Sequence, residues 1–192
     1  MQQRFLQFKI AALFLGLMTT TLYAQVPGTP YLMPSEIAPP PTPLVIQSTG
    51  TYTTSTGITV TATGSSGLTT YGYYTSGSCT ASGLWSSSTG AGNLDLSLSS
   101  PVTGTLTLHA SAMSVVGTAT EYFRVLQNGS TYLTPTIVTN CDVAYRSGNS
   151  VEATSGNDGA EVTYNLVNAT AITVDWEGGG NGSIFHVVLS SP

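Results

Sequence analysis

The sequence has very few charged side chains, and this scarcity excludes several classes of partner. Only 7% of its 192 residues are charged, with four Lys or Arg against nine Asp or Glu. Lysine occurs once, at Lys9. Because binding to nucleic-acid phosphates and anionic lipid surfaces depends on clustered Lys and Arg, we expect neither as a partner.

Sequence patterns of common catalytic and membrane-spanning classes are missing as well. The chain contains no G-x-S-x-G, no H-E-x-x-H and no P-loop, and only two histidines, His109 and His186. After the N-terminal segment, no apolar run is long enough for a membrane helix. We therefore expect a non-enzymatic protein without membrane insertion, and we interpret the histidines as structural or surface groups. A polysaccharide-acting hydrolase is an alternative, because sequence spacing does not determine which carboxylates or imidazoles meet in the fold.

The N-terminus has the pattern of an export signal. Arg4 and Lys9 precede the short apolar run IAALFLGLM, and TTTLYAQ follows it. This pattern predicts a secretory signal peptide over residues 1–24, cleaved after Ala24, and hence a secreted, extracellular or cell-surface protein. Cleavage would leave two basic residues against nine acids, a formal charge of 2 − 9 = −7.

Proline is concentrated directly after the predicted cleavage point. Seven of the ten prolines lie between residues 25 and 45. Proline fixes φ and has no N–H to donate, so this stretch predicts an extended arm or linker rather than part of a regular sheet. The remaining residues, 46–192, have a suitable length for a single domain with its own core.

Alternation of apolar and polar residues dominates the predicted domain. A period of two predicts strands with one buried and one solvated face, which is typical of antiparallel sheets. Glycine-rich turns at 64–67, 88–93, 127–130, 155–158 and 178–182 separate the strands. We therefore expect an all-β antiparallel β-sandwich, jelly-roll or Ig-like, with no significant helix after the signal peptide. The residues expected to point inward are Ile58, Val60, Ala62, Leu94, Leu96, Leu98, Leu106, Leu108, Val162, Tyr164, Leu166, Ile172, Val174 and Trp176.

The chain has exactly two cysteines, Cys79 and Cys141. In an oxidising compartment an even number favours a disulfide, here between positions 62 residues apart. Two unpaired buried thiols are the alternative.

The aromatic residues of TTYGYYTSG and of the segment after Cys79 are candidates for ligand contact. Strand alternation places Tyr71 and Tyr73 on one face and Tyr74 on the other, and Trp85 follows in a Ser- and Gly-rich segment. Rigid aromatic rings on a neutral, hydroxyl-rich surface suit saccharide stacking or protein adhesion. We therefore predict ligand binding by Tyr71, Tyr73 and Trp85, with ordinary cross-strand packing as the alternative.

Acidic residues near the C-terminus form a candidate cation site. In DWEGGGNG, Asp175 and Glu177 share the solvated face of a strand, and Asn181 lies in the glycine loop that follows. Oxygen ligands of this kind suit calcium, although the dense spacing of a dedicated calcium loop is missing. The alternative is a hairpin with an acidic edge. We expect no other cofactor.

The succession ITVTATGSSG, LSLSSPVTGTLTLHA, EYFRVLQNG, AEVTYNL and ITVDWEGGGNGSIFHVVLS resembles β-sandwich modules of bacterial secreted and surface adhesin-type proteins. The resemblance covers about residues 50–190 and implies a non-enzymatic role in attachment to a glycan or a surface protein. A carbohydrate-binding module is the related expectation. A structural subunit of an extracellular fibre or matrix is the alternative, with self-association through the N-terminal arm.

Overall fold

The structure is a computed structural model that describes residues 40–66, 68–86, 90–116, 119–142, 145–178 and 182–190. These residues form strands, turns and bends, and they contain no helix, which confirms the all-β prediction. None of the described segments contains a helix able to cross a membrane. The predicted signal peptide and residues 25–39 of the predicted arm lie outside the described residues.

The described segments contain fifteen strands, and all the strand pairs among them are antiparallel, as the alternation predicts. The strands are β1 (Leu44–Ile46), β2 (Gly50–Thr53), β3 (Thr59–Gly64), β4 (Thr69–Ser76), β5 (Cys79–Trp85), β6 (Gly90–Met113), β7 (Val115–Val116), β8 (Ala119–Thr120), β9 (Tyr122–Gln127), β10 (Thr131–Tyr132), β11 (Thr136–Asp142), β12 (Tyr145–Ser147), β13 (Ser150–Glu152), β14 (Asp158–Gly178) and β15 (Ile184–Ser190).

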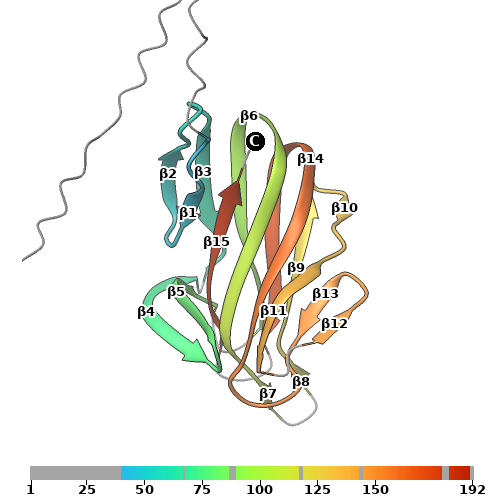
Figure 1. Ribbon diagram of the computed structural model, residues 1–192. Helices are drawn as coiled ribbons and strands as arrows, with labels where there is room; N and C mark the ends of the chain where they lie inside the picture. The colour runs from blue at the N-terminus through green and yellow to red at the C-terminus, as the bar shows by residue number, and fades with distance from the viewer. Residues whose placement is uncertain are drawn as a thin grey trace, which may run out of the picture. The chain divides into compact units, whose positions relative to one another are not determined.

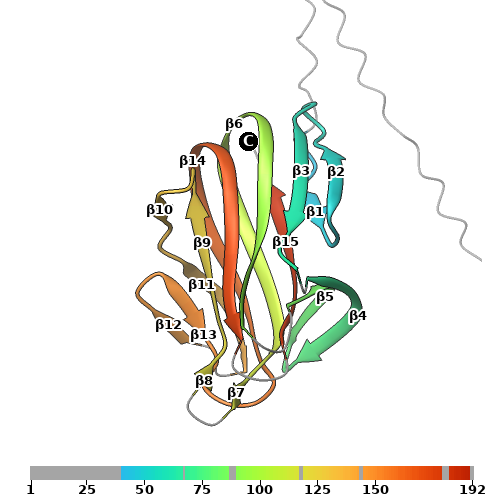
Figure 2. The ribbon, with the colours of Figure 1, turned by 180° about the vertical axis from the view of Figure 1, so that it is seen from behind.

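Two long strands, β6 and β14, organise the main sheet of 13 strands. They pair with each other along most of their length, and both turn back on themselves at one end of the molecule (Figures 1 and 2). The first half of β6 pairs with β3 and its second half with β15, while β14 pairs with β11 and then with β9. The sheet is therefore continuous and curls into a half-barrel.

Side-chain amides hold the bend of β14. The carboxamide of Gln127 donates to the carbonyl of Val167 at 2.8 Å and accepts from the same residue's N–H at 3.1 Å. The Oδ1 of Asn128 accepts from the N–H of Thr170 at 2.9 Å. Asn168 has a positive φ of 50°, a conformation that asparagine tolerates better than most residues. These contacts provide partners for backbone groups where the ladder between β6 and β14 shifts register.

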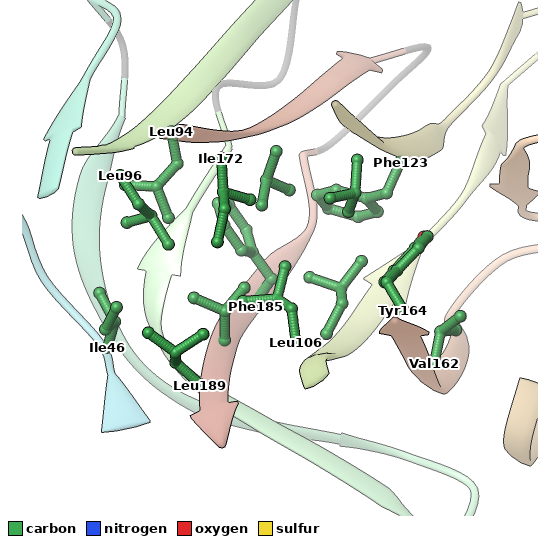
Figure 3. Packing of buried hydrophobic residues seen from close by; sticks show 14 of the residues in the cluster. Ile46, Leu94, Leu96, Leu106, Phe123, Val162, Tyr164, Ile172, Phe185 and Leu189 are labelled. Atoms are coloured by element: carbon green, nitrogen blue, oxygen red, sulfur yellow. The ribbon is translucent and has the colours of Figure 1, made fainter. Parts of the chain in front are cut away.

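The core lies on the inner face of the curled sheet (Figure 3). Every residue predicted to point inward is buried, except Ile58, which is partly buried against the core. Three large rings meet in the core: Phe185 lies 5.2 Å from Phe123 and 5.4 Å from Trp176 between ring centroids. The period-two prediction is confirmed because on a strand alternate side chains must point to opposite faces.

Element boundaries differ from the sequence prediction in several places, and in two of them by more than one residue. Leu44 and Val45, predicted as the end of the arm, belong to β1 and pair with β15. Residues 90–93, predicted as part of a turn, are instead the first residues of β6. Both segments pair with a distant strand, and such pairing is not visible in local composition.

Candidate functional site

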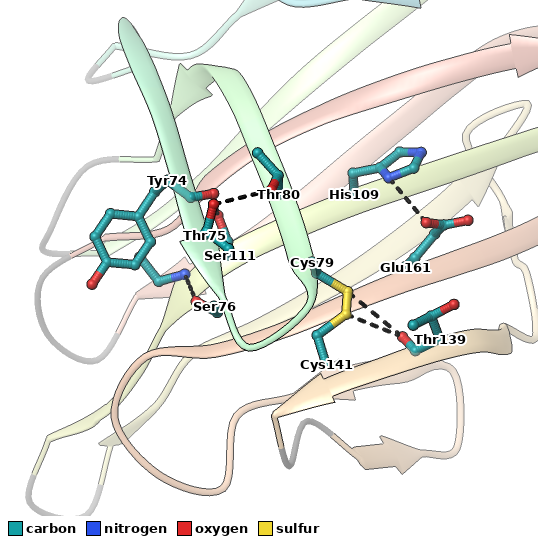
Figure 4. Close-up of a disulfide and its surroundings, with 11 residues drawn as sticks. Tyr74, Thr75, Ser76, Cys79, Thr80, His109, Ser111, Thr139, Cys141 and Glu161 are labelled. Carbon is teal, nitrogen blue, oxygen red and sulfur yellow. Dashed lines mark hydrogen bonds and ion pairs between the residues drawn. A yellow bond between two sulfur atoms is a disulfide. The ribbon is translucent and has the colours of Figure 1, made fainter. Parts of the chain in front are cut away.

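The hairpin of β4 and β5 carries the aromatic residues selected from the sequence. The end of β5 pairs with the beginning of β15. On β4, the other strand of the hairpin, the carbonyl of Tyr74 accepts a hydrogen bond from the hydroxyl of Ser111 of β6 at 3.0 Å. The N–H of Ala112 donates to the hydroxyl of Ser76 at 2.9 Å (Figure 4). The hairpin is therefore fastened to β6 and β15 and presents its aromatic rings in a defined position.

A disulfide adds a covalent anchor for the same hairpin. Cys79 at the start of β5 is bonded to Cys141 in β11, which confirms the predicted bridge (Figure 4). Their Cα atoms are 5.2 Å apart, within the usual range for disulfides. The bond is compatible with an oxidising location such as the extracellular space.

A β-bulge in β4 changes which tyrosines share a face. The ladder with β5 shifts register between Tyr71 and Tyr73, at Gly72. An extra residue in one strand reverses the alternation beyond it. As a result Tyr71 and Tyr74 line the same pocket, whereas Tyr73 does not line it and is 76% exposed. The prediction that Tyr71 and Tyr73 lie on one face, with Tyr74 opposite, is therefore wrong.

Tyr71, Tyr74 and Trp85 line one part of a pocket of about 410 Å³. Tyr71 and Trp85 form a tilted pair with ring centroids 6.1 Å apart and an interplanar angle of 45°. Tyr71 is 55% exposed and Tyr74 is 37% exposed, so both rings present apolar surface to solvent. The pocket thus unites two of the three predicted ligand-binding residues, Tyr71 and Trp85, with Tyr74.

The backbone around the pocket is unusual. Ala112 has a φ of 58° and Asn157 a φ of 64°, and both line the pocket. Such left-handed conformations are unfavourable for residues other than glycine, by about 1–3 kcal/mol each where strain persists, and they concentrate at ligand sites. A third lining residue, Gly182, has a φ of 77°. A Cβ at that position would lie 2.1 Å from the carbonyl oxygen of Ser86, so the close approach requires glycine.

Few polar groups lie among these apolar walls. The hydroxyl of Tyr74 donates to Oδ1 of Asn157 at 3.3 Å. Ser114 also lines the pocket and is only 7% exposed, yet its hydroxyl has no hydrogen-bond partner among the described residues. A buried hydroxyl without a partner is unfavourable by about 1–3 kcal/mol, so it is unusual in a native structure. Ser114 was not among the sequence candidates, because nothing distinguishes it from the many other serines.

The buried carboxylate of Glu121 forms hydrogen bonds with residues of the pocket wall. Glu121 is 2% exposed, and its oxygens accept hydrogen bonds from the N–H of Ser114 at 2.7 Å, the N–H of Gly182 at 2.9 Å and the hydroxyl of Ser183 at 2.9 Å. The N–H of Glu121 in turn donates to the carbonyl of Ser114 at 3.1 Å. Two lining residues from separate parts of the chain are thereby tied to one side chain.

Asp158 orders the loop that contains the pocket residue Asn157. Its carboxylate accepts from the N–H and the hydroxyl of both Thr154 and Ser155. Burial by itself would raise the pKa of Asp158, but these hydrogen bonds outweigh it and hold the pKa below its ordinary value. Because the carboxylate is engaged within its own loop, we interpret Asp158 as a structural group.

The predicted cation ligands make other contacts. Both carboxylate oxygens of Asp175 accept from the guanidinium of Arg124, at 3.2 and 2.9 Å. Oε2 of Glu177 accepts from the hydroxyl of Tyr122 at 2.6 Å. Asn181 lies outside the described residues, and the described residues contain no cluster of three or more His, Cys, Asp or Glu suited to a metal. Calcium binding stays a prediction, and the ion would have to displace Arg124 from Asp175.

The position of Arg124 was not predicted from the sequence. Its guanidinium lies 4.7 Å from the ring centroid of Tyr122 and 4.9 Å from that of Tyr132. Burial, followed by the hydrogen bond to Glu177, raises the pKa of Tyr122 to about 12. The spacing of Tyr122 and Arg124 along β9 was the available signal in the sequence, because it places both side chains on one face of the strand. It does not reveal their partners in β10 and β14, since these depend on which strands pair.

The two histidines stack across neighbouring strands. His109 and His186 are directly opposite in β6 and β15, with parallel rings 4.4 Å apart between centroids. Nδ1 of His186 accepts from the N–H of Ser82 at 3.3 Å, and Nδ1 of His109 lies 3.4 Å from Oε2 of Glu161 (Figure 4). Burial, and then the charge of His109, lowers the pKa of His186 to about 4. Burial also lowers the pKa of His109, although Glu161 opposes this. Cross-strand packing accounts for both imidazoles.

Comparisons of the chain with known proteins do not indicate a function. No protein-family model, no curated protein and no solved structure matches the chain.

Proposed function

We propose that this is a secreted, non-enzymatic, adhesin-like or carbohydrate-binding protein whose binding site is the pocket of Tyr71, Tyr74 and Trp85. The observation that carries the proposal is the coincidence of three aromatic rings with a pocket of about 410 Å³. Small-molecule pockets combine apolar walls with a few placed polar groups, and this pocket has both. Sugars match it chemically, since they present a C–H face to an aromatic ring and hydroxyls at their edges.

Three properties of the pocket favour a ligand over simple packing. Tyr71 and Tyr74 expose ring surface, whereas rings that serve only the core are buried, as Phe123 and Phe185 are. The strained conformation of Ala112 lies at the pocket rather than in an ordinary turn. The hairpin that carries the rings is anchored by a disulfide and by hydrogen bonds to β6, so little ordering is required on binding.

We also propose a specific type of β-sandwich and a secreted location for this protein. We interpret the half-barrel as a jelly-roll or Ig-like sandwich, in which the two halves of β6 supply strands to opposing layers. Secretion is supported by the N-terminal sequence pattern and by the compatibility of the disulfide with an oxidising compartment. A secreted protein with this pocket would then attach to a glycan on a surface.

Tyr73 provides a matched control for the test. Residues 25–192 with the disulfide oxidised would be screened on a glycan array, and affinity for the best ligand measured by calorimetry with calcium or with EDTA. We expect Tyr71→Ala to weaken binding about tenfold or more, since an aromatic anchor contributes about 1.4 kcal/mol or more. Tyr73→Ala, in the same strand but outside the pocket, should leave affinity unchanged. An array without any bound glycan, or equal losses in both variants, would refute the proposal.

A structural subunit of a fibre or matrix is the second candidate, and the edge strand β4 favours it. Seven of the eight residues of β4 are exposed, none carries a charge, and its ladder in the described fold is with β5 alone. Such an edge can accept a strand from another chain. Deleting residues 25–40 removes most of the predicted arm, residues 25–45, and leaves β1 intact. Assembly that depends on concentration and is lost in this deletion would support the fibre, whereas a monomer at all concentrations would exclude it.

A further inference from the structure

We propose that Glu121 is the positioning residue of the aromatic pocket, and that its buried carboxylate determines where the ring of Trp85 stands. Glu121 is not among the described residues that line the pocket, and it acts through hydrogen bonds to residues that do. The inference rests on the proposed function, because it concerns the shape of the proposed binding site.

Glu121 lies between β8 and β9, and its backbone is fixed on both sides. Its N–H donates to the carbonyl of Ser114 at 3.1 Å, and its carbonyl accepts from the N–H of Ala153 at 3.0 Å. The donors that reach its carboxylate are neutral: the N–H of Ser114, the N–H of Gly182 and the hydroxyl of Ser183. A carboxylate accepts at both oxygens and donates at neither, so it satisfies all three donors at once. Because a buried carboxylate without partners is strongly unfavourable, these donors are held in place around it.

The hydrogen bonds continue from Ser183 to Ser86, the residue that follows Trp85. The N–H of Ser183 donates to the hydroxyl of Ser86 at 2.8 Å, and the N–H of Ser86 donates to the carbonyl of Ser183 at 2.9 Å. The hydroxyl of Ser86 donates to the same carbonyl at 3.2 Å. Both serines are buried, and a hydrogen bond is electrostatically stronger in such surroundings than in water. The end of β5, which carries Trp85, is thereby joined to the residue before β15 and through it to Glu121.

One wall of the pocket is built around these hydrogen bonds. The lining residues that take part in them or adjoin them are Ser114, Gly182, Trp85 and Ile184. Trp85 is also directly opposite Ile184 in the ladder between β5 and β15, so a shift at the start of β15 moves Trp85 with it. The two tyrosines of the pocket lie on β4 and make none of these hydrogen bonds. Glu121 therefore determines how Trp85 stands relative to Tyr71, at a centroid distance of 6.1 Å and an angle of 45°. A displaced Trp85 should bind a ligand more weakly, because ring contacts depend on orientation.

Glu121→Gln tests this role with almost no change of shape. The amide keeps one acceptor oxygen and replaces the other by an NH2 group. In either orientation of the amide, the N–H of Ser114 or that of Gly182 then faces another donor. Val125→Ala is the control, since Val125 is buried in β9, does not line the pocket, and destabilises the fold without removing any of these hydrogen bonds. Incorporation of fluorotryptophan gives one fluorine NMR signal for each of the two tryptophans, and the signal lost in Trp85→Phe is that of Trp85.

We expect the Trp85 signal to shift or broaden in Glu121→Gln and to stay at its wild-type position in Val125→Ala. Ser86→Ala should also move the Trp85 signal, because it interrupts the same hydrogen bonds at their other end, and the two substitutions together should have less than their summed effect. This second variant decides the question if Glu121→Gln does not fold. A Trp85 signal that stays unchanged in both Glu121→Gln and Ser86→Ala would overturn the proposal.

Affinity for the best ligand of the glycan array gives the second measurement. We expect Glu121→Gln to bind about fivefold more weakly or worse, because an unpartnered buried N–H favours opened arrangements of the wall by about that factor. Val125→Ala should keep the wild-type affinity. If Glu121→Gln binds as tightly as wild type while Tyr71→Ala does not, the positioning role is refuted and the proposed function stands. If no saccharide binds, the proposed function fails, and the fluorine spectra still decide whether Glu121 positions Trp85.

Discussion

Replacing Tyr164 by phenylalanine should make the protein more stable. Tyr164 lies on the inner face of β14, opposite Leu106 of β6, and is 0% exposed (Figure 3). Its hydroxyl has no hydrogen-bond partner among the described residues. Burial raises the pKa of this phenol, so the group stays neutral in the core. The substitution removes one oxygen atom and leaves the ring where it is.

The expected gain is the difference between two opposing effects. Burying a hydroxyl without a partner destabilises the folded state by about 1–3 kcal/mol, and phenylalanine removes that penalty. The missing oxygen leaves a small gap, which offsets part of the gain because lost contacts and cavity volume are both unfavourable. We expect a net increase of about 1 kcal/mol in the free energy of unfolding. For a domain of this size the melting temperature should rise by about 2–4 °C.

Urea unfolding with the disulfide intact would measure this difference. The midpoint should rise while the slope of free energy against urea stays constant, since the surface exposed on unfolding is unchanged. Tyr52→Phe is the matched control, because the hydroxyl of Tyr52 donates to the carbonyl of Ser48 at 2.7 Å. That variant should lose about 1 kcal/mol. A loss of similar size in Tyr164→Phe would show that its hydroxyl is hydrogen-bonded in solution, and the reasoning would be refuted.

Three further predictions concern the anchored hairpin and its surroundings. Replacing Cys79 and Cys141 by serine should lower the free energy of unfolding by about 4 kcal/mol, from the closure of a 62-residue loop, and a loss below about 1 kcal/mol in urea unfolding would contradict this. Because the pKa of His186 is lowered from 6.5 to about 4, the unfolded chain binds a proton between these pH values that the folded chain does not. Stability should therefore fall as pH is lowered from 6.5 to 4, by roughly 1–2 kcal/mol after solvent screening, and in pH-dependent melts His186→Asn should show a smaller slope. Gly83→Ala should destabilise by at least about 2 kcal/mol, since φ is +103° and the new Cβ would lie 2.4 Å from a neighbouring carbonyl oxygen, whereas Gly72→Ala, with nothing within 4 Å of its Cβ, should be neutral; equal melting temperatures would contradict this.

Much of the fold could be predicted from local pattern. Val60, Leu96 and Val174 were assigned to the interior from alternation alone, and all three are buried. Alternation works here because neighbouring side chains of a strand necessarily face opposite ways. The course of β6 through Pro101 could not be predicted in this way. Whether a proline such as Pro101 ends a strand or lies in a bend within it depends on the strands that pair with the residues before and after the proline.

The candidate site could be predicted only in part. Tyr71 and Trp85 were selected because aromatic rings in a neutral segment are chemically distinctive. Tyr74 was assigned to the wrong face, because a bulge adds one residue to the strand and reverses the alternation. Ser114 and Glu121 had no local signal, since a serine hydroxyl without a partner among the described residues and a buried carboxylate are defined by their surroundings.

The amino-acid sequence by itself determined the all-β class, the inward faces of the strands and the pairing of the only two cysteines. These properties depend on side-chain type and on a period of two residues, both of which are local. Tertiary structure alone decided the curl of the sheet, the salt bridge of Asp175 with Arg124, and the meeting of β4, β6 and the loop before β14 around one pocket. Those features arise from contacts between residues far apart in the chain, where register and bulges determine which side chains meet.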